Sequence, residues 1–219
     1  MMRWSRPDIL NPTRELSCHM QVASMRHLQA MYRVMRYCLA TPERGLLLNP
    51  DGVWNGDREY EFVVMGMSDA NYATDPVTRK SISGYSVFLE GAPVSMKSGQ
   101  QNSVTLSSAE SELASATSCV QDMLYVMRVI ESIGLHVKKP MILKVDNRGA
   151  VGLANSWTVG GRTRHVEVCQ YFLCELKEEG LVLVEWISGE NMSSDIFTKN
   201  PAVATFKKHV TAFCGEDQY

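Results

Sequence analysis

Four acidic side chains have the types and positions needed for metal-assisted chemistry. Asp69 and Asp146 each follow a short apolar run typical of a buried strand, and Glu112 lies near the start of a long helical pattern. Asp195 lies in the first turn of a later helical pattern. Carboxylates brought together repel one another unless a cation lies between them, and Mg²⁺ prefers such oxygen ligands, with Mn²⁺ as the alternative ion. Because two ions about 4 Å apart can activate water and stabilise a leaving oxygen, these residues predict phosphodiester hydrolysis.

Two glutamates compete for the position on the long helix. Ser107 and Glu110 form a capping-box pattern, which is a sufficient structural reason for Glu110. Glu112 has no such role and precedes Leu113, the first residue of the apolar stripe, so it can lean towards the sheet. We therefore favour Glu112 as the ligand and keep Glu110 as the alternative. The aspartates also have structural explanations, because aspartate favours turns after strands and the first turn of a helix.

The elements that would position these residues follow from hydrophobic spacing. Short apolar runs predict strands over 62–67, 82–89, 94–97, 141–145 and 182–187. Helical spacing predicts helices over 18–39, 107–134, 150–155, 165–179 and 193–199. The helix over 107–134 carries an apolar stripe formed by Leu113, Ala116, Val120, Met123, Met127 and Ile130. This order is typical of an α/β fold with a mixed sheet and helices on its faces.

The first fifty residues differ from the rest in charge. They hold seven arginines and three acidic residues, whereas the whole chain has a net charge of -2. The turn-rich stretch over 49–59 is the best candidate for a linker. We therefore expect a helical N-terminal segment over 1–60, linker included, and a second domain over 61–219 with its core at 61–200. The helix of the first segment should end at Thr41, before Pro42.

Composition is that of a folded globular protein, with 45% hydrophobic and 21% charged residues. No apolar run approaches the roughly 18 residues of a membrane span, and the N-terminus has no signal-peptide pattern. Six cysteines are scattered without a Cys-x-x-Cys pair, so we expect reduced, mostly buried thiols and no zinc site. A cytoplasmic protein without a membrane partner is expected. The slightly acidic charge argues mildly against nucleic-acid binding but not against an enzyme with metal ions in an acidic centre.

Five local motifs carry a family resemblance. They read, in order, SDANYATDPVTRKSISGYSVFL, SSAESELASA, KVDNRGAVGLA, RTRHVEV and SSDIFTK. Together they resemble the ribonuclease H domain that ends the Pol polyprotein of copia-type (Pseudoviridae) retrotransposons. The stretch over 6–48 is similar to the tail of the reverse transcriptase that precedes this domain. The polymerase's own catalytic aspartates, fingers and palm have no counterpart here, so no polymerase activity is expected of this chain.

The resemblance implies a ribonuclease H-like fold with a five-stranded mixed sheet. It also implies an enzymatic activity. The implied activity is a two-metal-ion endonuclease that hydrolyses the RNA strand of RNA/DNA hybrids, located in a virus-like particle if the element is active. The polymerase portion of the same polyprotein is the other implied partner. The implied catalytic and metal-binding residues are Asp69, Glu112, Asp146 and Asp195. Cellular ribonucleases H carry a histidine before the last helix that is absent over 187–190 here, so slower turnover is expected.

Substrate recognition has weaker candidates. Polar groups at Asn71, Ser108 and Asn147 could reach the 2′-hydroxyls that distinguish an RNA/DNA hybrid from duplex DNA. Phosphates could be contacted by Arg79, Lys80, Arg148, Arg162, Arg164 and His165. Each of these basic residues has the alternative of being an ordinary solvated surface charge.

Two other functions compete with the nuclease. An integrase or transposase would share the fold, but its acidic residues follow the order Asp-Asp-Glu, with the glutamate last. Here Glu112 comes second, which favours ribonuclease H. The other alternative is a catalytically inactive or non-autonomous remnant of Pol that at most binds nucleic acid. Four retained carboxylates and uninterrupted motifs argue against decay.

Overall fold

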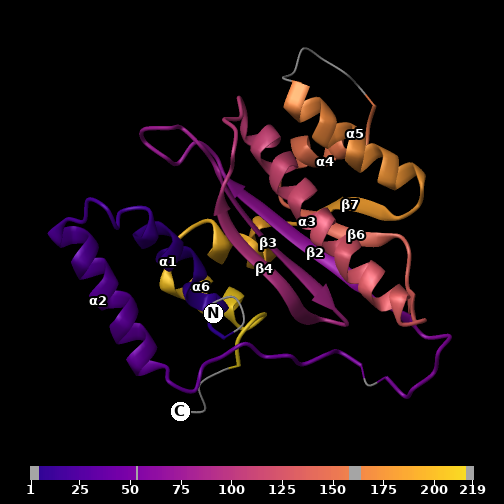
Figure 1. The fold of residues 1–219 in the computed structure, drawn as a ribbon, viewed down its shortest axis with the longest axis horizontal. Coiled ribbons are helices and arrows are strands. Elements are labelled where there is room, and N and C mark those ends of the chain that lie inside the picture. The colour runs from indigo at the N-terminus through magenta and orange to yellow at the C-terminus, as the bar shows by residue number, and fades with distance from the viewer. Residues whose placement is uncertain (1–4, 53, 158–163, 216–219) are drawn as a thin grey trace.

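A five-stranded mixed sheet lies at the centre of the fold (Figure 1). The structure, a computed structural model, describes residues 5–52, 54–157 and 164–215. The strands are β2 (Val64–Asn71), β3 (Ile82–Leu89), β4 (Ala92–Gln100), β6 (Met141–Val145) and β7 (Val182–Trp186). They lie side by side in the order β4-β3-β2-β6-β7. β3 pairs antiparallel with β2 and β4, whereas β6 is parallel to both β2 and β7.

Helices cover both faces of this sheet, so the fold has three layers (Figure 1). One face packs against α3 (Ser108–Ser132), α4 (Arg148–Ala154) and α5 (Arg164–Glu178). The opposite face packs against α1 (Leu10–Ser17), the 3-10 helix η4 (Ser193–Phe197) and α6 (Val203–Val210). The remaining elements are η2 (Pro7–Ile9), α2 (Met25–Ala40), β1 (Glu61–Phe62), β5 (His136–Val137) and η3 (Gly189–Asn191).

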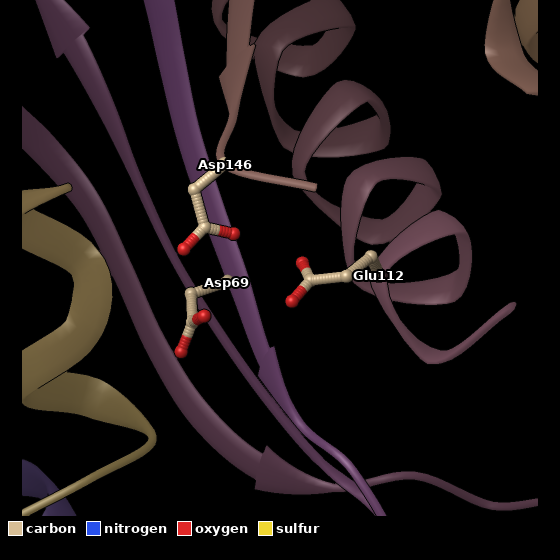
Figure 2. A group of neighbouring side chains, drawn as sticks. All are labelled: Asp69, Glu112 and Asp146. Atoms are coloured by element: carbon tan, nitrogen blue, oxygen red, sulfur yellow. The ribbon is translucent and has the colours of Figure 1, made fainter. Parts of the chain in front are cut away.

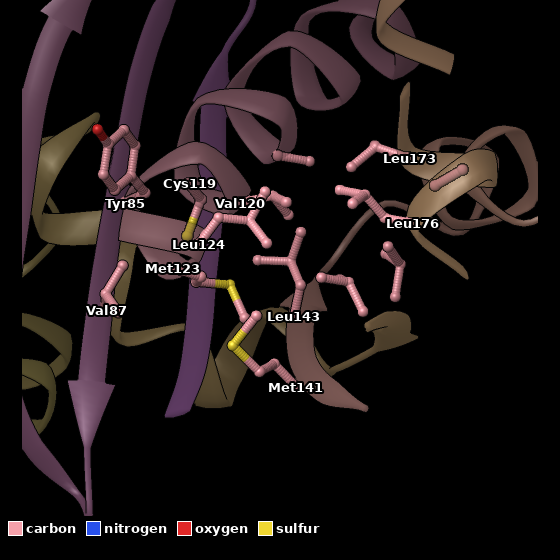
Figure 3. Close-up of a cluster of buried hydrophobic side chains, with 14 of the residues drawn as sticks. Tyr85, Val87, Cys119, Val120, Met123, Leu124, Met141, Leu143, Leu173 and Leu176 are labelled. Carbon is pink, nitrogen blue, oxygen red and sulfur yellow. The ribbon is translucent and has the colours of Figure 1, made fainter. Parts of the chain in front are cut away.

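The long helix α3 packs on the sheet through its predicted apolar stripe, which is confirmed (Figure 3). All six side chains of the stripe, from Leu113 to Ile130, are buried. Gly66 on β2 lets the helix approach closely, because a Cβ at this position would lie 2.8 Å from Sγ of Cys119. Near the start of the helix, the hydroxyl of Ser115 donates to the carbonyl of Asp69 at 2.9 Å. This contact holds the first turns of α3 over the middle of the sheet.

The predicted fold class is confirmed, since the chain has a ribonuclease H-like α/β fold with a five-stranded mixed sheet flanked by helices. One expectation about the strands is wrong. Asp69 lies inside β2 and not after it, because the antiparallel pairing with β3 continues as far as Asn71 and Ile82. Asp146 does follow directly on β6, as predicted. The last predicted helix, over 193–199, is the short 3-10 helix η4 instead of an α-helix.

The described N-terminal part of the chain forms two α-helices, whereas one was predicted, over 18–39. The helix predicted over 18–39 begins only at Met25, where the N–H of Ser24 donates to Nδ1 of His27 at 3.1 Å and caps the helix. It ends with Thr41 as its C-cap, as Pro42 predicted. The preceding helix α1 was not predicted, because its eight residues are too few to show a helical period.

The N-terminal segment packs against the C-terminal end of the chain. The backbone of Leu46 forms an antiparallel bridge with Cys214, and Leu10 of α1 packs on the cluster that contains Phe213. Tyr37 of α2 donates its hydroxyl to Asp8 at 2.8 Å, which ties α2 to the same region. The division of the chain into segments 1–60 and 61–219 stays a prediction.

Two expectations drawn from composition, one on the cysteines and one on membrane-spanning helices, can be compared with the structure. All six cysteines are free, and Cys119, Cys169, Cys174 and Cys214 are buried, which confirms unpaired and mostly buried thiols. Burial raises the pKa of the Cys119 thiol well above its ordinary value. In the described part of the chain, every helix is too short or too polar to cross a membrane.

Candidate active site

Three of the four predicted carboxylates meet near the C-terminal ends of the central strands β2 and β6 (Figure 2). Asp69 on β2 and Asp146 after β6 lie side by side because these parallel strands pair Ser68 with Val145. Glu112 reaches the same place from the second turn of α3. One carboxylate oxygen from each of the three residues lies within 4.8 Å of the others. We call Asp69, Glu112 and Asp146 the acidic triad.

The carboxyl group of Glu112 is buried and has a strongly raised pKa. Its side chain is 5% exposed, and its buried Oε2 has no hydrogen-bond partner among the described residues. Burial, followed by the negative charges of Asp69 and Asp146, raises the pKa of Glu112 to about 9. A backbone hydrogen bond from Ala70 and the charge of Lys199 only partly oppose this pKa shift. A buried carboxylate oxygen without a hydrogen-bond partner is costly unless the group is protonated or bound to a cation. The position is therefore suited to a positive ligand.

The neighbouring glutamate has the structural role that the sequence indicated. Ser107 is the N-cap of α3, and its hydroxyl accepts a hydrogen bond from the N–H of Glu110 at 3.2 Å. The carboxylate of Glu110 accepts from the N–H of Leu106 at 2.8 Å, one residue earlier than the capping-box pattern predicts. The structure thus brings Glu112 into the acidic triad and leaves Glu110 at the helix start.

The fourth carboxylate, Asp195, is joined to the acidic triad through a lysine. Nζ of Lys199 donates to Oδ1 of Asp69 at 2.9 Å and to Oδ1 of Asp195 at 3.1 Å. The hydroxyl of Thr198 donates to Oδ2 of the fully buried Asp69. Burial and the charge of Asp69 raise the pKa of Asp195 to about 6, although Lys199 opposes the shift. Burial and Asp69 also raise the pKa of Asp146.

A glycine lets Thr198 and Lys199 come this close to β2. Gly84 on β3 pairs with Asp69, and a Cβ at Gly84 would lie 2.8 Å from Cβ of Phe197. Any larger residue at this position would push the end of η4 away from the sheet. The amide of Asn71 at the end of β2 donates to the carbonyl of Thr198 at 3.3 Å, which holds the same segment from the other side.

The donor set fits a hard divalent cation. The acidic triad offers only carboxylate oxygens, one of them buried and without a partner among the described residues. Mg²⁺ and Mn²⁺ prefer such ligands, whereas softer metals prefer nitrogen or sulfur. A cation would also remove the repulsion that raises the pKa values of Glu112 and Asp146. The triad can therefore hold a metal ion and bring it to an oxygen-rich substrate.

Comparison with known proteins gives relatives of one kind over most of the chain. It is 28% identical over 198 residues to the retrovirus-related Pol polyprotein from transposon RE1 of Arabidopsis thaliana, a match over 90% of this chain. It is 27% identical over 195 residues to the corresponding protein from transposon TNT 1-94 of Nicotiana tabacum, over 89% of this chain. The chain is therefore a relative of retrovirus-related Pol polyproteins of plant transposons. It spans 13% of the length of the RE1 polyprotein and 14% of the TNT 1-94 polyprotein.

One further relative is not named as a transposon protein. The secreted RxLR effector protein 161 of Plasmopara viticola is 32% identical over 126 residues, a match over 58% of this chain and 83% of the effector. None of the protein-family models searched matches the chain.

Similar solved structures are distant. LC11-RNase H1, isolated from compost, has a TM-score of 0.47 at 12% identity, over 68% of this chain and 98% of the other. The protease-reverse transcriptase of prototype foamy virus has a TM-score of 0.40 at 13% identity, over 77% of this chain and 22% of the other. At these scores the likeness is loose, and the strand order of this chain itself carries the fold assignment.

The predicted 2′-hydroxyl contacts lie around the acidic triad but are partly engaged within the chain. The amide of Asn71 donates to Thr198. Asn147 caps α4, since its Oδ1 accepts from the N–H of Ala150 at 3.1 Å. Ser108 opens α3, four residues before Glu112. The side chains of Asn71 and Asn147 thus hold the backbone next to Asp69 and Asp146.

The predicted phosphate contacts are more dispersed. Arg148 lies next to the site, with its guanidinium 4.5 Å from the ring centre of Trp186, whose Nε1 donates to the carbonyl of Asp146 at 3.0 Å. Arg79 is exposed and Lys80 half-buried on the connection between β2 and β3. Arg162 lies outside the described residues, and so do the side chains of Arg164 and His165, which open α5. Arg148 is thus the predicted basic residue that the structure places beside the acidic triad.

The sequence interpretation missed the roles of Thr198 and Lys199. Both lie in the SSDIFTK motif, in which the sequence interpretation assigned a site role only to Asp195. The spacing of Asp195 and Lys199 is i,i+4, which places two side chains on one face of a helical turn. This spacing predicts an ion pair between these two residues. It does not reveal that Asp69, 130 residues away along the chain, shares the same ammonium group.

The raised pKa values predict how stability depends on pH. A carboxyl whose pKa is higher in the folded than in the unfolded chain binds more protons when folded, so its contribution to stability falls as pH rises between the two values. For Glu112 the window runs from its ordinary 4.5 to about 9, and Asp195 has the same sign up to about 6. The free energy of unfolding of the metal-free protein is therefore expected to fall across this range, as measured by urea denaturation in EDTA. A flat or rising profile would contradict the buried, repelling carboxylates.

Proposed function

We propose that this chain is a divalent-metal-dependent endonuclease that hydrolyses the RNA strand of RNA/DNA hybrids. The observation that carries the proposal is the acidic triad, with its unpartnered carboxylate oxygen, near the C-terminal ends of the central strands of a ribonuclease H-like sheet. The relationship to Pol polyproteins supports a role in handling nucleic acid. One of the similar structures, LC11-RNase H1, has been solved in complex with an RNA/DNA hybrid, at a TM-score of 0.44.

The catalytic roles follow from the positions of the side chains. Asp69, Glu112 and Asp146 would hold the ion, which when bound supplies the charge that activates water and stabilises the leaving oxygen. Thr198 and Lys199 orient the carboxylate of Asp69 by donating to its two oxygens. Asp195 would help to hold a second ion, as the family resemblance implies.

The substrate would approach across the exposed side of the acidic triad. Arg148, stacked on Trp186 beside Asp146, presents a positive charge suited to a phosphate. Asn71, Ser108 and Asn147 lie at the ends of elements next to the triad, from which their polar groups can reach 2′-hydroxyls. Recognition of this kind would select an RNA strand by its shape and hydroxyl groups.

The cellular setting is also a proposal. The relatives are much longer than this chain, so the polymerase portion of the same polyprotein is the natural partner. We propose a cytoplasmic location, within a virus-like particle if the element is active. Slower turnover than that of a cellular ribonuclease H is expected, because the stretch over 187–190 lacks a histidine.

The direct test is cleavage of a labelled RNA/DNA hybrid by the purified chain with Mg²⁺, Mn²⁺ or EDTA. RNA/RNA and DNA/DNA duplexes of the same sequence serve as controls. The expected result is metal-dependent cutting of the RNA strand of the hybrid alone. Binding without cutting would indicate that the polymerase portion is required, and neither binding nor cutting would favour an inactive remnant of Pol.

A further inference from the structure

Lys199 occupies a central position among the carboxylates. Its ammonium group lies between Asp69 and Asp195, at 2.9 Å and 3.1 Å from one oxygen of each. The lysine side chain is 38% exposed, whereas those of Asp69 and Asp195 are 1% and 17% exposed. A positive charge thus enters from solvent and reaches one fully buried and one half-buried carboxylate.

The backbone of Lys199 is held so that the side chain points into this position. The carbonyl of Lys199 accepts from Nδ2 of the fully buried Asn11 in α1 at 3.1 Å. The next residue, Asn200, donates its side-chain amide to Glu15 of α1 at 2.9 Å. The N–H of Lys199 donates to the carbonyl of Asp195 at 2.9 Å. The N-terminal helix and η4 therefore fix the lysine from both sides.

If Asp195 helps to hold a second divalent ion, as proposed above, that ion would lie between Asp69 and Asp195, where the ammonium group of Lys199 lies. The acidic triad provides one cation position, formed by Asp69, Glu112 and Asp146. Asp195 is not one of these three residues. Its link to them is Lys199, whose ammonium group donates to both Asp195 and Asp69. A second ion held by Asp69 and Asp195 would compete with the ammonium group of Lys199, because the ion and the ammonium group would bind the same carboxylate oxygens.

We propose that Lys199 is a tethered cation at this second position, so that the chain by itself binds one divalent ion tightly at the acidic triad. A second ion binds only by displacing the lysine from Asp69 and Asp195. The inference rests on the proposed function and deepens it, because it assigns unequal affinities to the two ion positions. Until a second ion arrives, the ammonium neutralises the repulsion between two carboxylates that no other described cation contacts.

The experiment is calorimetric titration of the metal-free full chain with Mg²⁺ and with Mn²⁺. The variants are Lys199→Met, which removes the charge and keeps the length of the stem, and Lys199→Arg, which keeps the charge. Lys139→Met is the matched control, because it removes a lysine that pairs with Glu131 at the surface at 2.7 Å. Lys199→Gln is a second neutral variant, used if Lys199→Met does not fold by circular dichroism.

The wild type, Lys199→Arg and Lys139→Met are expected to bind one ion tightly and a second weakly. The neutral variants at position 199 are expected to bind the second ion about tenfold more tightly or better, which corresponds to about 1.4 kcal/mol. Their melting temperature in EDTA should fall below that of Lys139→Met and recover on adding Mg²⁺, because the unneutralised carboxylates then gain a cation.

Two results would overturn the proposal. One is an unchanged affinity for the second ion in the neutral variants, and the other is a wild type that binds two ions equally tightly. If the wild type cleaves hybrids but either result is found, the inference about Lys199 fails and the proposed function stands. If no form of the protein binds a divalent ion, both fail together.

Discussion

Asp69→Asn is expected to abolish hybrid cleavage, with a loss of about a thousandfold or more, while the chain stays folded. Asp69 is at the centre of the site. Its carboxylate lies next to those of Glu112 and Asp146, and it accepts hydrogen bonds from Thr198 and Lys199. Asparagine keeps the shape but removes the charge that would hold the ion. Metal ions contribute several kcal/mol to such reactions, and each 1.36 kcal/mol is tenfold in rate. Cleavage of labelled hybrid in Mg²⁺ and Mn²⁺ measures the loss.

Asp122→Asn is the matched control for this substitution. Asp122 lies on the same helix as Glu112 but accepts from Tyr85 and Ser95 outside the acidic triad, at 2.9 Å and 2.8 Å. It should leave cleavage within a fewfold of the wild type. Full activity of Asp69→Asn, or loss of the folded state by circular dichroism, would refute the role given to Asp69.

Glu112→Gln and Glu110→Gln are expected to separate catalysis from stability. Glu112→Gln should remove cleavage, because it takes away a carboxylate from the acidic triad. Glu110→Gln should retain cleavage and cost on the order of 1 kcal/mol of stability, because its carboxylate accepts from the N–H of Leu106 at the helix start. Hybrid cleavage and urea denaturation of the two variants measure the two effects.

The same pair of variants also tests the pH dependence. Glutamine at position 112 resembles the protonated form of the glutamate, whose pKa is raised to about 9. Glu112→Gln should therefore flatten the decline in stability between about pH 5 and pH 9, whereas Glu110→Gln should keep it. If Glu110→Gln loses cleavage and Glu112→Gln keeps it, the wrong glutamate has been placed in the site.

Much of the fold follows from local pattern. The spacing of apolar residues predicts α3 almost to its ends, and the five apolar runs correspond to the five strands of the sheet. These predictions succeed because burial of one face imposes a period on the sequence of each element. The prediction failed for α1, whose eight residues are too few to show such a period and are held by contacts with distant parts of the chain.

Part of the candidate site also follows from the sequence. The order and types of Asp69, Glu112, Asp146 and Asp195 are written in the sequence, and so is the capping pattern that separates Glu110 from Glu112. The spacing of Asp195 and Lys199 even indicates an ion pair. Residue type and local spacing were therefore enough to predict an acidic, cation-binding centre and the chemistry suited to it.

Only the tertiary structure decides how these groups share charge. Parallel pairing of β2 and β6 brings Asp69 next to Asp146, and close packing at Gly84 admits Thr198 and Lys199 to the same carboxylate. Asn11, from a helix nearly two hundred residues away along the chain, then fixes the lysine. Local spacing cannot reveal such contacts, because electrostatic energy depends on distance in space and on burial, and both are set by the packing of remote segments.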